Sequence, residues 1–220
     1  TLAGEATMTI HQGQAFEDPG ATAVDNYDGE LAPASSQLFP TDGLLMHLDA
    51  SNILGVAPGG DVDTWTDSSG EGNDATKSGG GPYLEEDAIN GRPAVYFDGA
   101  SRITAPMTVG NKYTVVSVTR ADGIRKGRLM SSSDQNWLLG YHNVYEDVFH
   151  PSGWSSNRDA PVSDKIHLYS ATSTGSNRVQ FYSNGSNLTT TTTRNGQIGH
   201  FQLGAYRTGN EPGSGHVAEV

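Results

Sequence analysis

The sequence predicts an all-β protein, an antiparallel jelly-roll sandwich with a short N-terminal β extension, and three observations support this prediction. Apolar residues alternate with a period of two along several segments, as in strands that bury one face. Glycine accounts for 28 of the 220 residues and proline for ten, which indicates many turns. No window of the sequence combines helical periodicity with end caps. Many short strands joined by glycine turns are typical of a sandwich or a barrel.

The alternating segments can be followed along the chain. The first begins where Leu44, Met46 and Leu48 share one side of an extended segment. Near the C-terminal end of the series, Asn184-Gly185 predicts a hairpin, because both central residues of a type I′ turn need positive φ. The other alternating runs cover residues 94–97, 113–118, 166–170, 179–181 and 201–205.

The first 38 residues have a different pattern from the rest. A short strand is expected at Thr7–Ile10, and turns are expected at Phe16–Gly20 and Asp25–Gly29. Residues 33–40 are typical of a linker. Because thirty-odd residues are too few to build a core of their own, we expect 1–38 to be an extension and linker, and 39–220 to be the sandwich domain.

Composition excludes several classes of function. The chain has no cysteine, so disulfides, thiolate zinc sites, iron–sulfur clusters and cysteine nucleophiles are excluded. It has 25 acidic and 13 basic residues, a net charge of −12, which disfavours nucleic acid and, unless a cation bridges, strongly anionic ligands. No apolar run reaches the roughly 20 residues that a membrane helix needs, so no membrane insertion is expected.

Two parts of the chain resemble known families. Residues 6–31, and most specifically Phe16–Gly29, resemble the first half of an immunoglobulin-like bacterial cell-surface repeat. From Gly43 onward, the chain resembles a laminin-G-like domain of the concanavalin A-like lectin/glucanase superfamily. The segments that carry this second resemblance are Gly43–Ser51, Trp65–Ala75, Asn90–Gly99 and Asn136–His142.

The laminin-G-like resemblance implies a function. Such modules are usually non-catalytic and bind carbohydrate or protein on secreted or surface-attached proteins, sometimes with calcium. We therefore expect an extracellular binding module of bacterial origin, whose partner is a glycan or an extracellular protein. His216–Val220 resembles the start of the family's last strand, cut short, which implies a piece of a larger protein.

Two alternatives remain open. The half repeat and the shortened last strand would leave open sheet edges, so the chain could be a structural subunit of an adhesin, fibre or virion appendage that self-associates by strand exchange. The other alternative is a polysaccharide lyase or hydrolase. The strand 200–206 is similar to one in such lyases, but the E-x-D-x-x-E motif of the glucanases is absent, and the adjacent acids Glu146 and Asp147 are expected on opposite faces of a strand.

An aromatic cluster is the candidate ligand site, because flat rings can stack on the apolar faces of sugars while polar neighbours form hydrogen bonds. The alternative is that the rings belong to the core, above all Trp137, which lies beside Leu138 and Leu139. His142, Tyr145 and Trp154 have the better chance of exposure. The candidate ligand-binding residues are His142, Tyr145, Trp154, Trp137 and Tyr141.

An oxygen-rich loop is the candidate metal site. Asp67, Asn73 and Asp74 lie in a glycine-containing segment, and calcium prefers several oxygen ligands from flexible loops. The spacing does not match an EF-hand. The alternative is that these side chains form Asx-turns with their own backbone.

Overall fold

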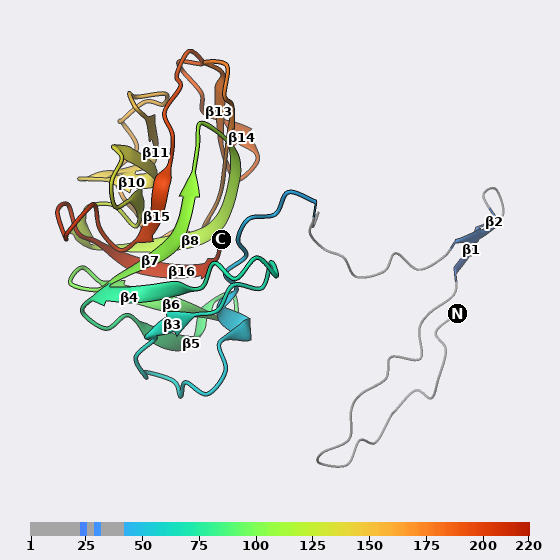
Figure 1. Ribbon diagram of the computed structural model, residues 1–220, viewed down its shortest axis with the longest axis vertical. Coiled ribbons are helices and arrows are strands. Elements are labelled where there is room, and N and C mark those ends of the chain that lie inside the picture. The colour runs from blue at the N-terminus through green and yellow to red at the C-terminus, as the bar shows by residue number, and fades with distance from the viewer. Residues whose placement is uncertain (1–22, 26–28, 32–41) are drawn as a thin grey trace. The chain divides into compact units, whose positions relative to one another are not determined.

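The computed structural model describes residues 23–25, 29–31 and 42–220 (Figure 1). The chain divides into two units, Thr1–Gly43 and Leu44–Val220. In the first unit, β1 (Ala23–Asp25) pairs antiparallel with β2 (Gly29–Leu31), and the two strands flank the turn expected at residues 25–29. The strand expected at 7–10, the turn expected at 16–20 and the linker expected at 33–40 lie outside the described residues.

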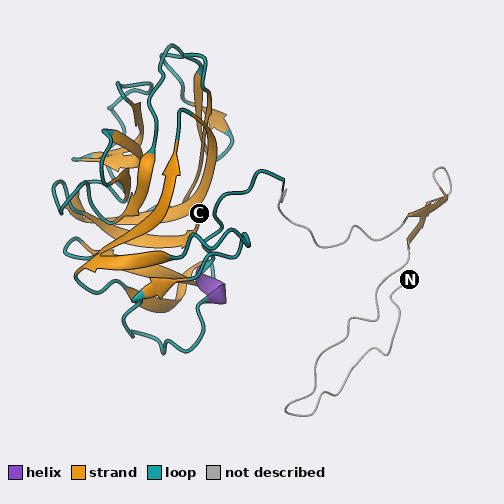
Figure 2. Cartoon of the chain, in the orientation of Figure 1, coloured by secondary structure: helices purple, strands orange, loops and turns teal. Residues whose placement is uncertain are grey.

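The second unit is a sandwich of two seven-stranded antiparallel sheets, which confirms the predicted fold class (Figure 2). We name each sheet by its edge strands. The β11–β3 sheet has the order β11 (Tyr145–Pro151), β10 (Trp137–His142), β9 (Met130–Ser132), β15 (Gly199–Leu203), β7 (Arg102–Val109), β4 (Ala75–Gly79) and β3 (Thr64–Trp65). The β14–β5 sheet has the order β14 (Ser186–Asn187), β13 (Val179–Ser183), β12 (His167–Thr174), β8 (Lys112–Lys126), β16 (Gly213–Glu219), β6 (Arg92–Asp98) and β5 (Tyr83–Ile89).

The core lies between the two sheets and is rich in aromatic rings. Trp137 of β10 contacts Phe149 of β11 and Tyr113 of the opposite sheet, and its indole N–H donates a 2.9 Å hydrogen bond to the Tyr113 hydroxyl. Tyr141 packs edge-on against Tyr169 of the opposite sheet, with the ring centroids 5.6 Å apart. Burial of large rings therefore fixes the inward side of β10, and His142 at the end of the strand is partly exposed.

The last strand is central rather than exposed. β16 pairs with β6 on one side and with β8 on the other. This corrects the expectation of an open edge at residues 216–220. The segment predicted as a strand at 44–48 is extended and joins the end of β16: the backbone N–H groups of Leu48 and Val220 each donate a 2.9 Å bond to the other's carbonyl oxygen. Helix in the described part of the chain is limited to one 3₁₀ turn, η1 (Ala50–Asn52).

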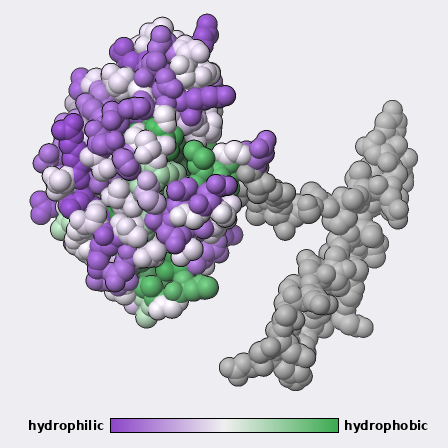
Figure 3. All heavy atoms as spheres, viewed as in Figure 1, coloured by the Kyte–Doolittle hydropathy of each residue, from purple (hydrophilic) through white to green (hydrophobic). Residues whose placement is uncertain are grey.

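The surface of the second unit is mostly polar, with some apolar patches in the view of Figure 3. The most exposed large apolar side chains are Leu54 and Ile124, at 88% and 73% exposure. No helix among the described residues has both the length and the apolar character needed to cross a bilayer.

Candidate functional site

An aromatic and basic cluster lies on the outer side of the β11–β3 sheet, and we call it the Trp154 surface: His142, His150, Trp154 and Arg158. His142 ends β10 and His150 lies near the end of β11, each following an inward-facing ring in the alternation of its strand. Trp154 lies three residues beyond the end of β11. The alternation that buries Tyr141 and Phe149 thus turns the two histidines outward toward Trp154.

Short distances hold this surface together. The Trp154 ring centroid lies 5.2 Å from that of His142 and 4.8 Å from that of His150, both edge-on. The guanidinium carbon of the exposed Arg158 lies over the Trp154 ring, 4.6 Å from its centroid. Trp154 is itself half-buried. The ring therefore lies against two imidazoles and also contacts the guanidinium of an exposed arginine.

The backbone at Trp154 is fixed by Arg194. The Nη2 and Nε groups of Arg194 donate to the Trp154 carbonyl oxygen at 3.2 and 3.4 Å. Gly153 makes this approach possible, because a Cβ at this position would lie 2.7 Å from the Arg194 Nε. The loop that carries the ring is thus anchored rather than free.

An ion pair between the buried Arg128 and the partly exposed Glu211 lies beside the surface. The Nε of Arg128 donates to the Glu211 carboxylate at 2.5 Å, and the Nε2 of His142 lies 3.4 Å from the same carboxylate oxygen. Other Arg128 nitrogens donate to the side chain of Asn136 and to the Trp137 carbonyl, and its guanidinium lies 4.1 Å from the centre of the Tyr206 ring. The Arg128 charge is thus balanced and held in place.

Burial sets the charge state of the two histidines. Desolvation lowers the pKa of His142 below its usual value, and the nearby cations Arg128 and Arg158 act in the same direction, against the attraction of Glu211. Desolvation also lowers the pKa of His150, with Arg128 and Arg194 adding to it, although a bond to the Asn136 carbonyl opposes the shift. Both rings are therefore neutral near pH 7 and can donate or accept hydrogen bonds.

The sequence-predicted ligand residues divide into two groups. His142 and Trp154 come together, and Tyr145 is the cross-strand partner of His142, so it lies on the same face of the sheet. Trp137 and Tyr141 are in the core, at 0% and 2% exposure, which corrects their assignment to a ligand-facing surface. Their side chains point between the two sheets, which places them on the opposite side of β10 from His142. Sequence reasoning missed Arg158 and Arg128, because their positions in the sequence do not predict that they lie close to Trp154 and His142 in the folded chain.

The predicted metal loop is organised by one carboxylate. Asp67 Oδ1 accepts the backbone N–H groups of His47 and Ser69 at 2.8 and 2.9 Å. Its Oδ2 accepts the Ser69 hydroxyl at 2.7 Å and the Asn73 N–H at 2.9 Å. Asp74 in turn accepts the Asp67 N–H. Burial by itself would raise the Asp67 pKa, but these hydrogen bonds outweigh it and lower the pKa.

This geometry matches the Asx-turn alternative for Asp67. All four acceptor positions of its carboxylate are used by protein donors, so they do not point at a common cation. Calcium binding at Asp67, Asn73 and Asp74 stays a prediction, and the contacts of Asp67 give it a structural role in its place.

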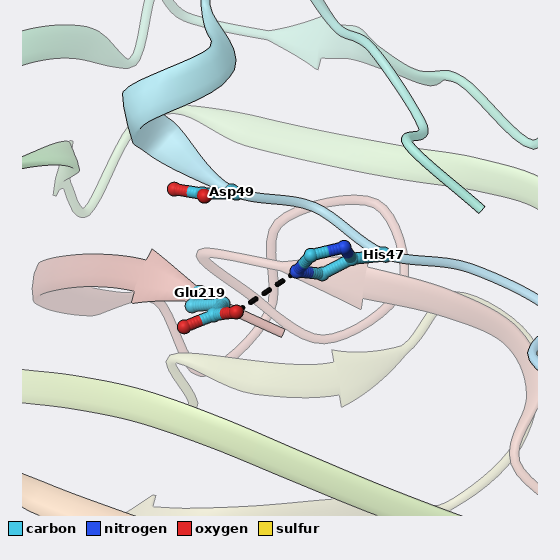
Figure 4. Close-up of side chains that lie close together, drawn as sticks. All are labelled: His47, Asp49 and Glu219. Carbon is cyan, nitrogen blue, oxygen red and sulfur yellow. Dashed lines mark hydrogen bonds and ion pairs between the residues drawn. The ribbon is translucent and has the colours of Figure 1, made fainter. Parts of the chain in front are cut away.

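A second group of possible metal ligands lies where the first residues of the second unit meet the end of β16, and sequence reasoning missed it. One ligand atom each from His47, Asp49 and Glu219 lie within 4.8 Å of one another (Figure 4). The His47 Nε2 lies 2.8 Å from a Glu219 oxygen, and Asp49 and Glu219 also line a pocket of about 170 Å³. An imidazole with two carboxylates suits zinc or manganese better than calcium. The His47–Glu219 contact also ties the segment before η1 to β16 in the absence of any ion.

Glu146 and Asp147 do not lie on opposite faces, which corrects the expectation for adjacent acids. Asp147 has a positive φ of 59°, and both carboxylates lie beside His167: Glu146 Oε2 is 3.5 Å from its Nε2, and Asp147 Oδ1 is 3.3 Å from its Nδ1. Glu146 also accepts the N–H and hydroxyl of Ser163. Because His167 and Glu146 are buried, this network joins the two sheets and presents no carboxylate pair to a substrate.

Comparison with known proteins supports the β-sandwich fold of the described residues. No protein-family model matches the sequence, and no curated protein matches it significantly. Domain 4 of AbnA, a GH43 extracellular arabinanase from Geobacillus stearothermophilus, solved in complex with arabinotriose, aligns with a TM-score of 0.58 at 19% identity, over 80% of this chain and 89% of that one.

Two further solved structures are similar. A mutant GH54 α-L-arabinofuranosidase aligns with a TM-score of 0.51 at 14% identity, over 72% of this chain and 46% of that one. A mutant Trypanosoma rangeli sialidase displaying trans-sialidase activity aligns with a TM-score of 0.51 at 18% identity, over 82% of this chain and 30% of that one. At these identities the likeness supports the sandwich fold alone.

Proposed function

We propose that this protein is a non-catalytic, secreted or surface-attached carbohydrate-binding module, and that glycans bind at the Trp154 surface. The observation that carries the proposal is a partly exposed indole ring, anchored on the outer side of a sheet between two neutral imidazoles. Such an arrangement combines an apolar stacking platform with a few placed polar groups. The arabinotriose complex of AbnA domain 4 supports it, since a sandwich of similar fold binds a sugar.

Arg158 has a defined part in this proposal. It is exposed and lies over the Trp154 ring, so a sugar that stacks there must move it aside or share the ring with it. Since an exposed cation–π contact is worth only about 0.5–1 kcal/mol, a ligand can displace it at small cost. Tyr145, on the same face as His142, extends the platform along the β10–β11 hairpin.

The test is a glycan array followed by titration calorimetry. Trp154→Ala is expected to abolish binding and Tyr145→Ala to weaken it, while the melting temperature changes by only a few degrees, because both side chains are only partly buried. Tyr182→Ala is the matched control: Tyr182 is a half-buried tyrosine on β13 of the other sheet, and its loss should leave binding unchanged. Glycan binding that survives Trp154→Ala would place the site elsewhere.

A polysaccharide lyase is the second candidate, favoured by one observation. Arg128, His142 and Tyr206 are linked through Glu211 and a cation–π contact, and Gln202 lies nearby on the strand that resembled lyases. Against it, the Arg128 side chain is 5% exposed and its charge is balanced by Glu211, while the Gln202 amide donates to two backbone carbonyls. Incubation with a panel of acidic polysaccharides tests it, and the accumulation of unsaturated or newly reducing ends would establish catalysis.

Self-association by strand exchange has less support. Loop residues form backbone hydrogen bonds with both long edge strands: Gly59 and Gly60 bond with Leu84 of β5, and Ala160 bonds with Glu146 of β11. Such coverage blunts an edge against pairing with another chain. The laminin-G-like and immunoglobulin-like resemblances, a protein ligand and calcium remain part of the proposal, which the glycan array with and without calcium addresses.

A further inference from the structure

The charge around the Trp154 surface is opposite to the charge of the chain. Four arginines gather there, Arg128, Arg158, Arg194 and Arg207, although the whole sequence has only 13 basic residues against 25 acidic ones. The acidic group in contact with them is Glu211, and Asp159 is the sequence neighbour of Arg158. The surface is therefore locally cationic on an anionic molecule.

A continuous series of contacts joins these groups. Arg158 lies over Trp154, Trp154 contacts His142, and His142 lies 3.4 Å from Glu211. Glu211 pairs with Arg128, whose guanidinium lies over the Tyr206 ring. The Arg207 guanidinium lies 4.9 Å from the centre of that same ring. The two aromatic rings thus each have an exposed arginine beside them, and the Arg128–Glu211 ion pair links them.

The four arginines have different capacities to meet a ligand. Arg128 and Arg194 are committed to protein acceptors, and Glu211 balances the charge of Arg128. Arg158 and Arg207 are exposed, and each rests its guanidinium near an aromatic ring. A planar guanidinium can bond a carboxylate or sulfate with two parallel N–H groups while its stem or face stays in contact with the ring.

From this arrangement we propose that the Trp154 surface selects anionic glycans, whose carboxylate or sulfate groups bind Arg158 and Arg207 while a sugar ring stacks on Trp154. This inference rests on the proposed function and narrows its ligand class. It reverses the expectation from net charge, because a cation need not bridge where the local field is already positive.

The test uses two matched pairs of probes. Oligogalacturonate is compared with its fully methyl-esterified form, and dextran sulfate with dextran, so each pair differs in charge but not in backbone. The charged member of at least one pair is expected to bind at least tenfold more tightly, and the pair that shows the difference identifies carboxylate or sulfate as the ligand group. Its binding should weaken several-fold between 50 and 500 mM NaCl, because exposed charges are screened.

Single arginine variants test which side chains bind the charged group of the probe. Arg158→Gln and Arg207→Gln are each expected to weaken binding of the charged probe about fivefold, as for the loss of one solvent-exposed ion pair. Arg178→Gln, at an exposed arginine in the hairpin between β12 and β13, is the matched control and should leave binding unchanged. Equal loss in all three variants would show a general charge effect and overturn the inference.

The outcomes separate this inference from the proposed function. A glycan that binds in a Trp154-dependent way, with neutral and charged probes equal, overturns the anionic preference and leaves carbohydrate binding standing. Binding of neither charged probe also overturns the preference. The loss of all Trp154-dependent binding on the glycan array is what would remove the proposed function itself.

Discussion

Asp67 shows how one side chain can organise a loop that has no regular structure. Its two oxygens accept four protein donors from residues up to 20 positions away in the chain. Because each buried N–H that loses its partner costs roughly 1–3 kcal/mol, this carboxylate matters more to folding than its position in a loop would indicate.

Removal of the Asp67 carboxylate is therefore expected to destabilise the protein. For Asp67→Ala we expect the free energy of unfolding to fall by about 2–4 kcal/mol, since several backbone N–H groups lose their acceptor together. Denaturant titration measures the change, with Asp164→Ala at an exposed aspartate as the comparison, expected to cost under about 0.5 kcal/mol. Equal costs for the two variants would contradict the structural role of Asp67.

At the scale of single elements, β10 depends on one glycine. A register shift between Gly140 and Tyr141 interrupts the pairing of β10 with β11, and Gly140 has a φ of 96°. A Cβ at this position would lie 2.8 Å from the Tyr169 ring of the opposite sheet. The bulge thus lets the backbone approach Tyr169 and turns Tyr141 inward and His142 outward.

Gly140→Ala and Gly185→Ala together separate backbone strain from this close approach. Gly185 has a similar φ of 80°, but nothing lies within 4 Å of its would-be Cβ. We expect Gly185→Ala to cost about 1 kcal/mol from the left-handed backbone alone, and Gly140→Ala to cost about 2–3 kcal/mol more from overpacking. Chemical denaturation of both variants measures the difference, and equal costs would show that Tyr169 accommodates the added methyl group.

Period-two alternation predicted most of the strands but not which side of each strand faces inward. β12 buries His167 and Ser173 and leaves Leu168 47% exposed, and β8 buries Ser117 while Val116 is 44% exposed. At these positions an apolar side chain faces outward while its polar neighbour is buried. Partners from distant segments, such as the Glu146 and Asp147 carboxylates beside His167, determine which side chains are buried. The local sequence does not indicate these partners.

The candidate site was predictable to a similar extent. Aromatic density located the β10–β11 region, and His142 and Trp154 meet there. The four arginines are spread along the sequence between residues 128 and 207, and the His47–Glu219 contact joins residues 172 positions apart. Only folding brings such groups together. The basic character of the site therefore could not be predicted from a sequence whose net charge is −12.

At the scale of the whole molecule, buried ionisable groups set the response of stability to acid. The pKa values of His142 and His150 are lowered, so the unfolded chain binds more protons than the folded one near pH 6. Their contribution to stability is present above the unfolded value of about 6.5 and is lost as pH falls through the folded pKa. The Asp134 carboxyl, with its pKa lowered to about 2 by bonds from His200 and Ser132 that outweigh burial, adds a second loss below about pH 4.

The melting temperature is therefore expected to fall in two steps as pH decreases from 7 to 2. In the first step, between about pH 6.5 and 5, His142→Gln and His150→Gln should each flatten the slope, because glutamine does not titrate. Thermal melts of the wild type and both variants at closely spaced pH values test this. A wild-type melting temperature that is constant from pH 7 to 5 would contradict the assignment of these rings as neutral and buried.

The most direct measurement uses the three tryptophans of the chain, which give three indole N–H signals in a two-dimensional ¹⁵N–¹H spectrum. Trp65 and Trp137 are fully buried, while Trp154 forms the proposed stacking platform. On titration with a glycan that binds, the account predicts that the Trp154 signal, assigned through Trp154→Phe, shifts in a saturable way while the other two stay in place. Saturable binding that leaves the Trp154 signal unmoved would contradict it.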